Sequence, residues 1–162
     1  MGQSLNHYTN GNAAGSQWIL TRSNAGVSGD FSDMNGRFVF TTTFTAPAGT
    51  SGGEILGRVA ADNQVQAILL NGVDSGFAGG PMSSPSNGFP FTPFSVTGGF
   101  QPGLNTLSFV VWNQPQTGGN PVGLNVNLRS AVVHTPEPAT LAVVGLTFGA
   151  AGFRAWRRKR AG

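Results

Sequence analysis

The chain has 162 residues, a net charge of +3 at neutral pH and no cysteine, and only 9% of its residues are charged. Residues 1–135 hold four arginines and five acidic residues, whereas residues 136–162 hold four arginines, one lysine and one glutamate. The larger part therefore carries −1, which excludes the basic surface that nucleic-acid binding requires. The absence of cysteine excludes a disulfide framework, a thiolate metal site and a thiol nucleophile.

Turn-forming residues separate short aromatic and β-branched runs, which is typical of an all-β domain. The length suits one such domain followed by a tail. One polar tripeptide and one dipeptide predict tight connections: Asp62-Asn63-Gln64, and Asn71-Gly72 at the end of a run. The predicted strands, in chain order, are Gln17–Thr21, Arg37–Thr45, Glu54–Ala61, Val65–Leu70, Gly88–Val96, Leu104–Asn113 and Val122–Val133.

Two of these runs alternate between apolar and polar positions, which predicts strands with one buried face. In Arg37–Thr45 one face carries three phenylalanines. Pro90 and Pro93 interrupt another run and predict an edge or irregular strand. The spacing of the strands predicts an antiparallel two-sheet β-sandwich, a jelly roll, with long loops at Gly72–Asn87 and Gln114–Pro121. The predicted buried face of the last strand consists of Val122, Leu124, Val126 and Leu128.

The C-terminal residues have a different composition. Pro136-Glu137-Pro138 is stiff, and Ala139–Phe153 is uncharged. A helix extended through Trp156 is about 27 Å long, close to the roughly 30 Å hydrocarbon core of a membrane. We therefore predict one C-terminal transmembrane helix with a cytoplasmic end. The alternative is a helix buried in the core. Such a helix normally has a polar face, and the only polar side chains of this segment are those of two threonines. The basic cluster that follows consists of Arg154, Arg157, Arg158, Lys159 and Arg160.

This order of parts resembles the PEP-CTERM sorting signal of Gram-negative bacteria. The resemblance implies recognition by an exosortase, a membrane-embedded cysteine transpeptidase that cuts near Pro-Glu-Pro and transfers the body to another carrier. It also implies an exported protein of the exopolysaccharide or biofilm matrix, held in the inner membrane before processing and placed at the cell surface or in the extracellular matrix afterwards. The matching residues are Pro136, Glu137, Pro138, Ala139, Thr140, Gly145 and Arg157–Arg160.

We therefore divide the chain into a β-sandwich domain, residues 1–133, and a sorting signal, residues 134–162. Met1–Asn10 has neither a basic nor an apolar segment of the kind that begins a secretory signal peptide. Proteins with this sorting signal normally carry such a peptide. We therefore expect a signal peptide and a first strand to precede Met1 in the natural protein.

Three stretches of the body resemble the galactose-binding-like β-sandwich that is found in many PEP-CTERM proteins. They are Gly57–Gly76, Gly98–Asn113 and Asn120–Leu128. The order of a strand ending in Asn-Gly and a later Pro-Gly-x-Asn-x-Leu strand entry recurs in the sugar-binding jelly rolls of glycosidases. The resemblance implies the fold and transfers no sugar-binding residue set.

Candidate glycan-binding residues are Asp62, Asn63, Asn71, Trp112 and Asn113. The first three offer oxygen atoms for a sugar hydroxyl or for Ca²⁺, or they are turn residues bonded to the backbone. Trp112, like Trp18, could stack on a sugar ring or fill a core.

No arrangement of residues indicates catalysis. His7 and His134 lack further ligands at metal-binding spacing, Asp30 and Asp33 lie in a glycine-rich loop, and no GxSxG elbow or P-loop is present. We expect no cofactor, no metal and no enzymatic activity. The leading hypothesis is an exported protein that associates with or binds exopolysaccharide. The alternatives are an inert structural sandwich without a ligand and a tail-anchored carbohydrate-active enzyme.

Overall fold

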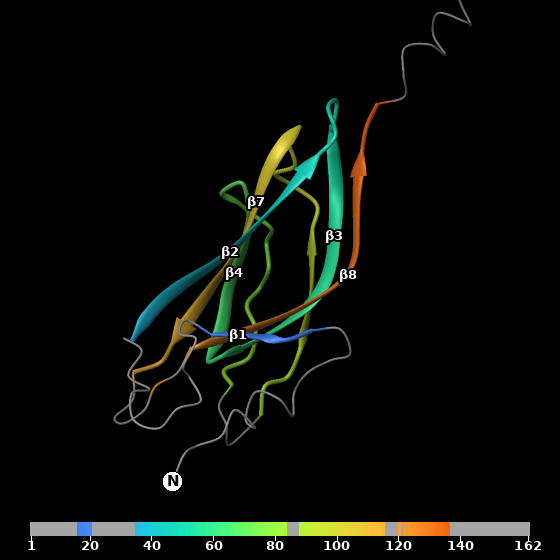
Figure 1. The fold of residues 1–162 in the computed structure, drawn as a ribbon. Helices are drawn as coiled ribbons and strands as arrows, with labels where there is room; N and C mark the ends of the chain where they lie inside the picture. Colours follow the sequence, from blue (N-terminus) through green and yellow to red (C-terminus); the bar gives the residue numbers. More distant parts are fainter. Residues whose placement is uncertain (1–15, 21–34, 84–87, 116–119, 121, 137–162) are drawn as a thin grey trace, which may run out of the picture.

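The computed structural model describes residues 16–20, 35–83, 88–115, 120 and 122–136. Its strands form two antiparallel sheets (Figure 1): sheet I, in the order β1-β8-β3-β6, and sheet II, in the order β2-β7-β4-β5. The predicted all-β architecture with two antiparallel sheets is confirmed. The strands are β1 (Trp18–Leu20), β2 (Gly36–Ala46), β3 (Gly52–Asp62), β4 (Gln64–Leu70), β5 (Val73–Asp74), β6 (Thr92–Val96), β7 (Gly103–Asn113) and β8 (Gly123–His134).

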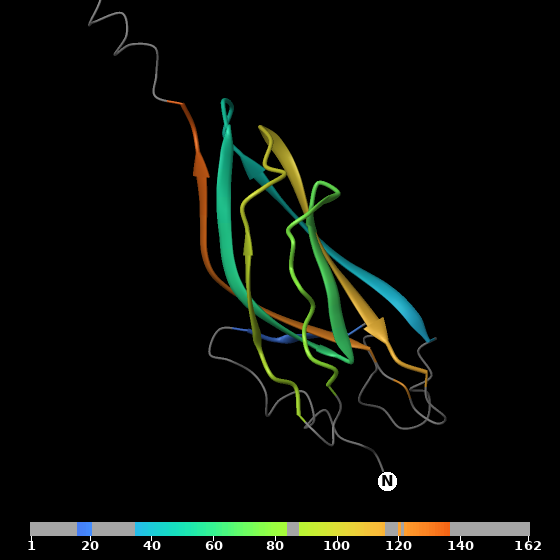
Figure 2. The ribbon, with the colours of Figure 1, turned by 180° about the vertical axis from the view of Figure 1, so that it is seen from behind.

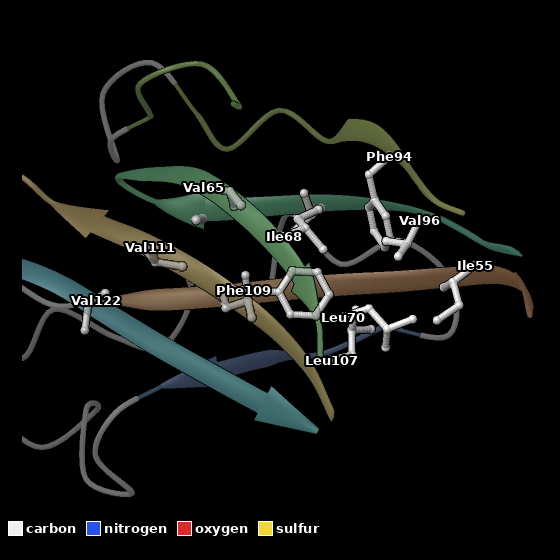
Figure 3. Close-up of a cluster of buried hydrophobic side chains, with 13 residues drawn as sticks. Ile55, Val65, Ile68, Leu70, Phe94, Val96, Leu107, Phe109, Val111 and Val122 are labelled. Carbon is white, nitrogen blue, oxygen red and sulfur yellow. The ribbon is translucent and has the colours of Figure 1, made fainter. Parts of the chain in front are cut away.

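Side chains of both sheets meet in one hydrophobic core (Figure 3). Alternate residues of β7 point into it, so that Leu107, Phe109 and Val111 are buried. The predicted phenylalanine face of β2 packs against the same core from the edge of sheet II. The buried members of the core are Ile55, Val59, Ala61, Val65, Ile68, Leu70, Phe94, Val96, Leu107, Phe109, Val111, Val122 and Leu124.

The predicted loop at residues 72–87 contains a short strand that the sequence did not indicate. Asn71 and Gly72 both have positive φ, 52° and 81°, and form the two-residue turn of a β4–β5 hairpin. The chain then runs beside β4, where Ser75 N donates to Ile68 O and Gly80 N to Val65 O (Figure 2). These bonds cover much of the outer edge of β4.

The prediction for one core position of β8 was wrong. Leu128 was expected to be buried with Leu124 and Val126, but its side chain is 54% exposed. The pairing of β3 with β8 shifts at this point, because Leu56 pairs with Ser130 and Gly57 with Leu128. Arg129 is the extra residue of this β-bulge, which bends β8 directly after Leu128, and none of residues 128–134 is buried.

Two glycines of β3 lie directly under aromatic rings. A Cβ atom added to Gly57 would lie 2.7 Å from Phe94 Cζ and 2.8 Å from Asn127 O. One added to Gly53 would lie 2.8 Å from Phe100 Cε1. These rings therefore fill the space that side chains occupy at other inward positions of the strand.

Replacing Gly57 by alanine is expected to destabilise the protein by about 1–3 kcal/mol, because the methyl group must displace Phe94 or the β8 backbone. The measurement is the free energy of unfolding in urea. Gly98→Ala is the matched control, since no heavy atom lies within 4 Å of its added Cβ. Equal stabilities of the two variants would contradict the prediction.

Candidate functional site

One residue, Asn63, carries the chain from β3 in sheet I to β4 in sheet II. Its backbone N donates to Trp112 O (3.2 Å), and its backbone O accepts from Ser83 N (2.8 Å). Its Nδ2 donates to Asp62 Oδ1 and Ser83 O, both at 2.9 Å, and its Oδ1 accepts from Gln114 N at 2.7 Å. The side-chain amide of Asn63, a predicted glycan-binding residue, therefore makes its hydrogen bonds within the protein.

Asn113 lies beside this corner and points inward from the end of β7. It is fully buried, and its Nδ2 donates to Asn120 O at 3.3 Å, while its Oδ1 has no hydrogen-bond partner among the described residues. Asn120 Nδ2 in turn donates to Asn35 Oδ1 (2.9 Å) and Gln114 O (3.1 Å). Asp62, Asn63 and Asn113, each at most 6% exposed, thus lie together in a buried polar cluster at one end of the sandwich.

Asn71 lies at the opposite end of β4 from this cluster. Its Oδ1 accepts from Thr106 N, and its Nδ2 donates to Gly99 O and Asn105 Oδ1, all at 2.8 Å. Asn105 is fully buried and donates to Gln101 O at 2.7 Å. The Asn-Gly and Pro-Gly-x-Asn-x-Leu stretches, on which the resemblance to the galactose-binding-like sandwich was based, are therefore joined by hydrogen bonds of these two side-chain amides.

Trp112 lies on the outer face of sheet II, opposite the core positions of β7, and is half-buried. It pairs with Arg37 on β2 and with Gln64 on β4. Arg37 Nε donates to Gln66 Oε1 at 2.8 Å, so the two side chains connect the strands on either side of β7. The aromatic ring therefore stands among arginine and glutamine side chains, which are donors and acceptors suited to sugar hydroxyls.

Sequence reasoning missed Arg58, which lies half-buried on the outer face of β3. Its guanidinium carbon is 4.9 Å from the centroid of the Phe91 ring. Its Nε is buried and has no hydrogen-bond partner in the part of the chain that the structure describes. Strand alternation could have placed Arg58 on an outer face, but nothing in the sequence shows that Phe91 covers it.

Trp18, the other tryptophan considered from the sequence, packs its ring against Phe89, with centroids 5.1 Å apart at 69°. Among the described residues no group of three or more His, Cys, Asp or Glu side chains could hold a metal ion. His134 is the last residue of β8. The residues His7, Asp30 and Asp33 lie outside the described part of the chain.

The tail leaves the body directly from β8. His134 pairs with Gly52, and its carbonyl accepts a hydrogen bond from Ser51 N at 2.8 Å. Pro136 is the last described residue of the predicted sorting motif, and Glu137, Pro138, Ala139, Thr140 and the basic cluster lie beyond the described residues. In the described part, no helix has the length and apolarity to cross a membrane. The predicted transmembrane helix falls outside that part.

Fold and tail together define an all-β protein of two sheets whose last strand continues into a C-terminal sorting segment. Comparison with known families identifies that segment, because the PEP-CTERM protein-sorting motif matches residues 134–160. No curated protein and no solved structure matches the chain. The chain therefore carries a PEP-CTERM motif, which indicates exosortase-dependent sorting of an exported protein that is processed at the membrane and ends at the cell surface.

Replacing Asn71 by glycine tests the amide contacts of the turn without straining its backbone, since glycine adopts positive φ readily. We expect a loss of about 1–3 kcal/mol in the free energy of unfolding, because the buried Asn105 loses a partner. Gly72→Asn is a suitable control, because it keeps a residue that tolerates positive φ and leaves Asn71 intact. An Asn71→Gly variant as stable as the wild type would contradict the structural role of this amide.

Proposed function

We propose that the protein is an exported, non-enzymatic β-sandwich whose body associates with extracellular polysaccharide after an exosortase has processed the tail. The observation that carries the proposal is the sorting motif at residues 134–160, joined to a body of near-neutral charge. The outward aromatic ring of Trp112, with Arg37 and Gln66 beside it, supports a contact with sugar.

The placement of Trp112 relative to the tail also supports the proposal. His134 pairs with the first residue of β3, Gly52, whereas Trp112 lies beside the corner that follows the last residue, Asp62. Ten residue steps of β-strand at about 3.3 Å each separate the two ends by roughly 33 Å. The last residues of β7 and of β8 lie at opposite ends of the sandwich (Figure 1). A polymer could therefore reach Trp112 while the tail is still held at the membrane.

An inert surface sandwich without a ligand is the second candidate. It is favoured by the internal use of the amides of Asn63, Asn71 and Asn105. These asparagines stabilise turns and corners, and so would be required whether or not the body binds a glycan.

Processing is tested with the full chain, fused to a secretory signal peptide and expressed in a Gram-negative host that contains an exosortase. The wild type should be shortened by about the mass of the tail. Replacing Pro136, Glu137 and Pro138 together by alanine should leave it uncut, as judged by intact-mass spectrometry. The same chain in a host without the exosortase is the control. Equal cleavage of wild type and variant in both hosts would contradict exosortase processing.

Glycan association is tested by affinity electrophoresis of the full chain in gels that contain neutral or acidic polysaccharides. Trp112→Ala should weaken binding about tenfold, because aromatic packing on a sugar is worth about 1 kcal/mol or slightly more. Leu104→Ala is the control, since this residue is exposed on the same face of β7. Retardation by none of the polysaccharides would favour the inert sandwich.

A further inference from the structure

The acidic residues of β3 itself lie too far from Arg58 to pair with it. Glu54 and Asp62 lie on the same face of β3, four residues away on either side, which is about 13 Å along a strand. The residues that pair with Arg58 across the sheet are Asn127 on β8 and Pro93 on β6, and neither carries a charge. The positive charge of this arginine is therefore not neutralised by its neighbours in the sheet.

The guanidinium group of Arg58 is nevertheless held in place. Phe91 lies over it at 4.9 Å, and such a contact attracts the cation to the ring face and orients its plane. Its Nε is buried and makes no hydrogen bond with the described residues. Because Nε has no surface open to an incoming group, a ligand would meet the two terminal nitrogens of this oriented guanidinium.

Aromatic side chains continue away from Arg58 along the same outer face of sheet I. Trp18 pairs with Asn125, which lies two residues before Asn127 and therefore on the same face of β8. Phe89, two residues before Phe91, meets Trp18 edge to face. The segment that precedes β6 thus places one phenylalanine against the arginine and the other against the tryptophan of β1.

We propose that Arg58 and Phe91 form a subsite for the carboxylate of a uronic-acid unit in an acidic polysaccharide. The two terminal nitrogens of the guanidinium would donate two parallel hydrogen bonds to the two carboxylate oxygens. The rings of Trp18 and Phe89 offer apolar area for the C–H faces of neighbouring sugar rings. A carboxylate is planar and carries a single negative charge. It therefore suits a site in which Arg58 is the cation and the residues paired with it include no second arginine or lysine.

This subsite rests on the proposed function, that the body associates with polysaccharide, and names the chemical class of the polymer. It is separate from Trp112, because Arg58 lies on the outer face of sheet I and Trp112 on that of sheet II. A polysaccharide could therefore bind at either residue without the other.

The test compares binding of the full chain to polygalacturonate, to its methyl ester and to a neutral galactan. Wild type should bind polygalacturonate at least about tenfold more tightly than the ester, which lacks the charge. Arg58→Gln should remove this preference and leave galactan binding unchanged. Arg129→Gln is the matched control, because it removes the same charge from an exposed position of the same sheet. It should change polygalacturonate binding by less than about twofold.

Arg58→Lys covers the case in which the glutamine variant does not fold. This variant keeps the charge but loses the paired donors, so its preference for polygalacturonate over the ester should fall several-fold while its melting temperature stays near that of the wild type. Equal losses in Arg58→Gln and Arg129→Gln, or equal wild-type binding to polygalacturonate and its ester, would overturn the subsite.

The outcomes also separate this subsite from the proposed function. Binding of galactan alone would remove the subsite and keep the association with polysaccharide. Conversely, monomeric galacturonate, but not sulfate, could shift the NMR signal of Arg58 Nε–H while no polymer binds. That result would keep the carboxylate subsite and remove the association with polysaccharide. If neither polymer nor galacturonate binds, both proposals fail.

Discussion

The passage of the chain from one sheet to the other through Asn63 is the constraint on which the rest of the structure depends. A single residue between β3 and β4 leaves the sheets no freedom to slide, because consecutive Cα atoms are only about 3.8 Å apart. At this point the chain has left one sheet and does not yet pair in the other. Asn63 must therefore supply hydrogen bonds for backbone groups that neither sheet pairs. Its hydrogen bonds to Trp112, Gln114 and Ser83 do so, and they fix the end of β7 on which Trp112 stands.

The core between the sheets leaves two outer faces that differ in chemistry. Sheet II presents Trp112 with hydrogen-bonding neighbours, whereas sheet I presents an arginine under an aromatic ring. The tail leaves from the other end of the body, where His134 pairs with Gly52. The tail and the corner are separated by the length of β3 and β8. This separation would let sorting and the proposed association with polysaccharide use different parts of the body.

Strand positions and the fold class were predictable because they depend on local alternation and on turn residues. The Asn71-Gly72 turn was predictable for the same reason. The exposure of Leu128 was not, since the bulge beside it is a feature of how β8 pairs with β3, which the alternation of a single strand does not show. The roles of the candidate asparagines were also beyond sequence reasoning, because the partners of Asn63 and Asn71 include Gln114 and Thr106, 51 and 35 residues away.

The sequence by itself determined the uneven distribution of charge, the two-sheet class of fold and the sorting tail, because each depends on residues that are close together in the sequence. A sorting motif is a linear signal, and the match to residues 134–160 needs no folded structure to be recognised. Only the tertiary structure decided which polar residues face inward and which side chains meet. Arg58 and Phe91 are 33 positions apart in the sequence, and they meet because β6 pairs with β3 and brings the preceding segment over its outer face.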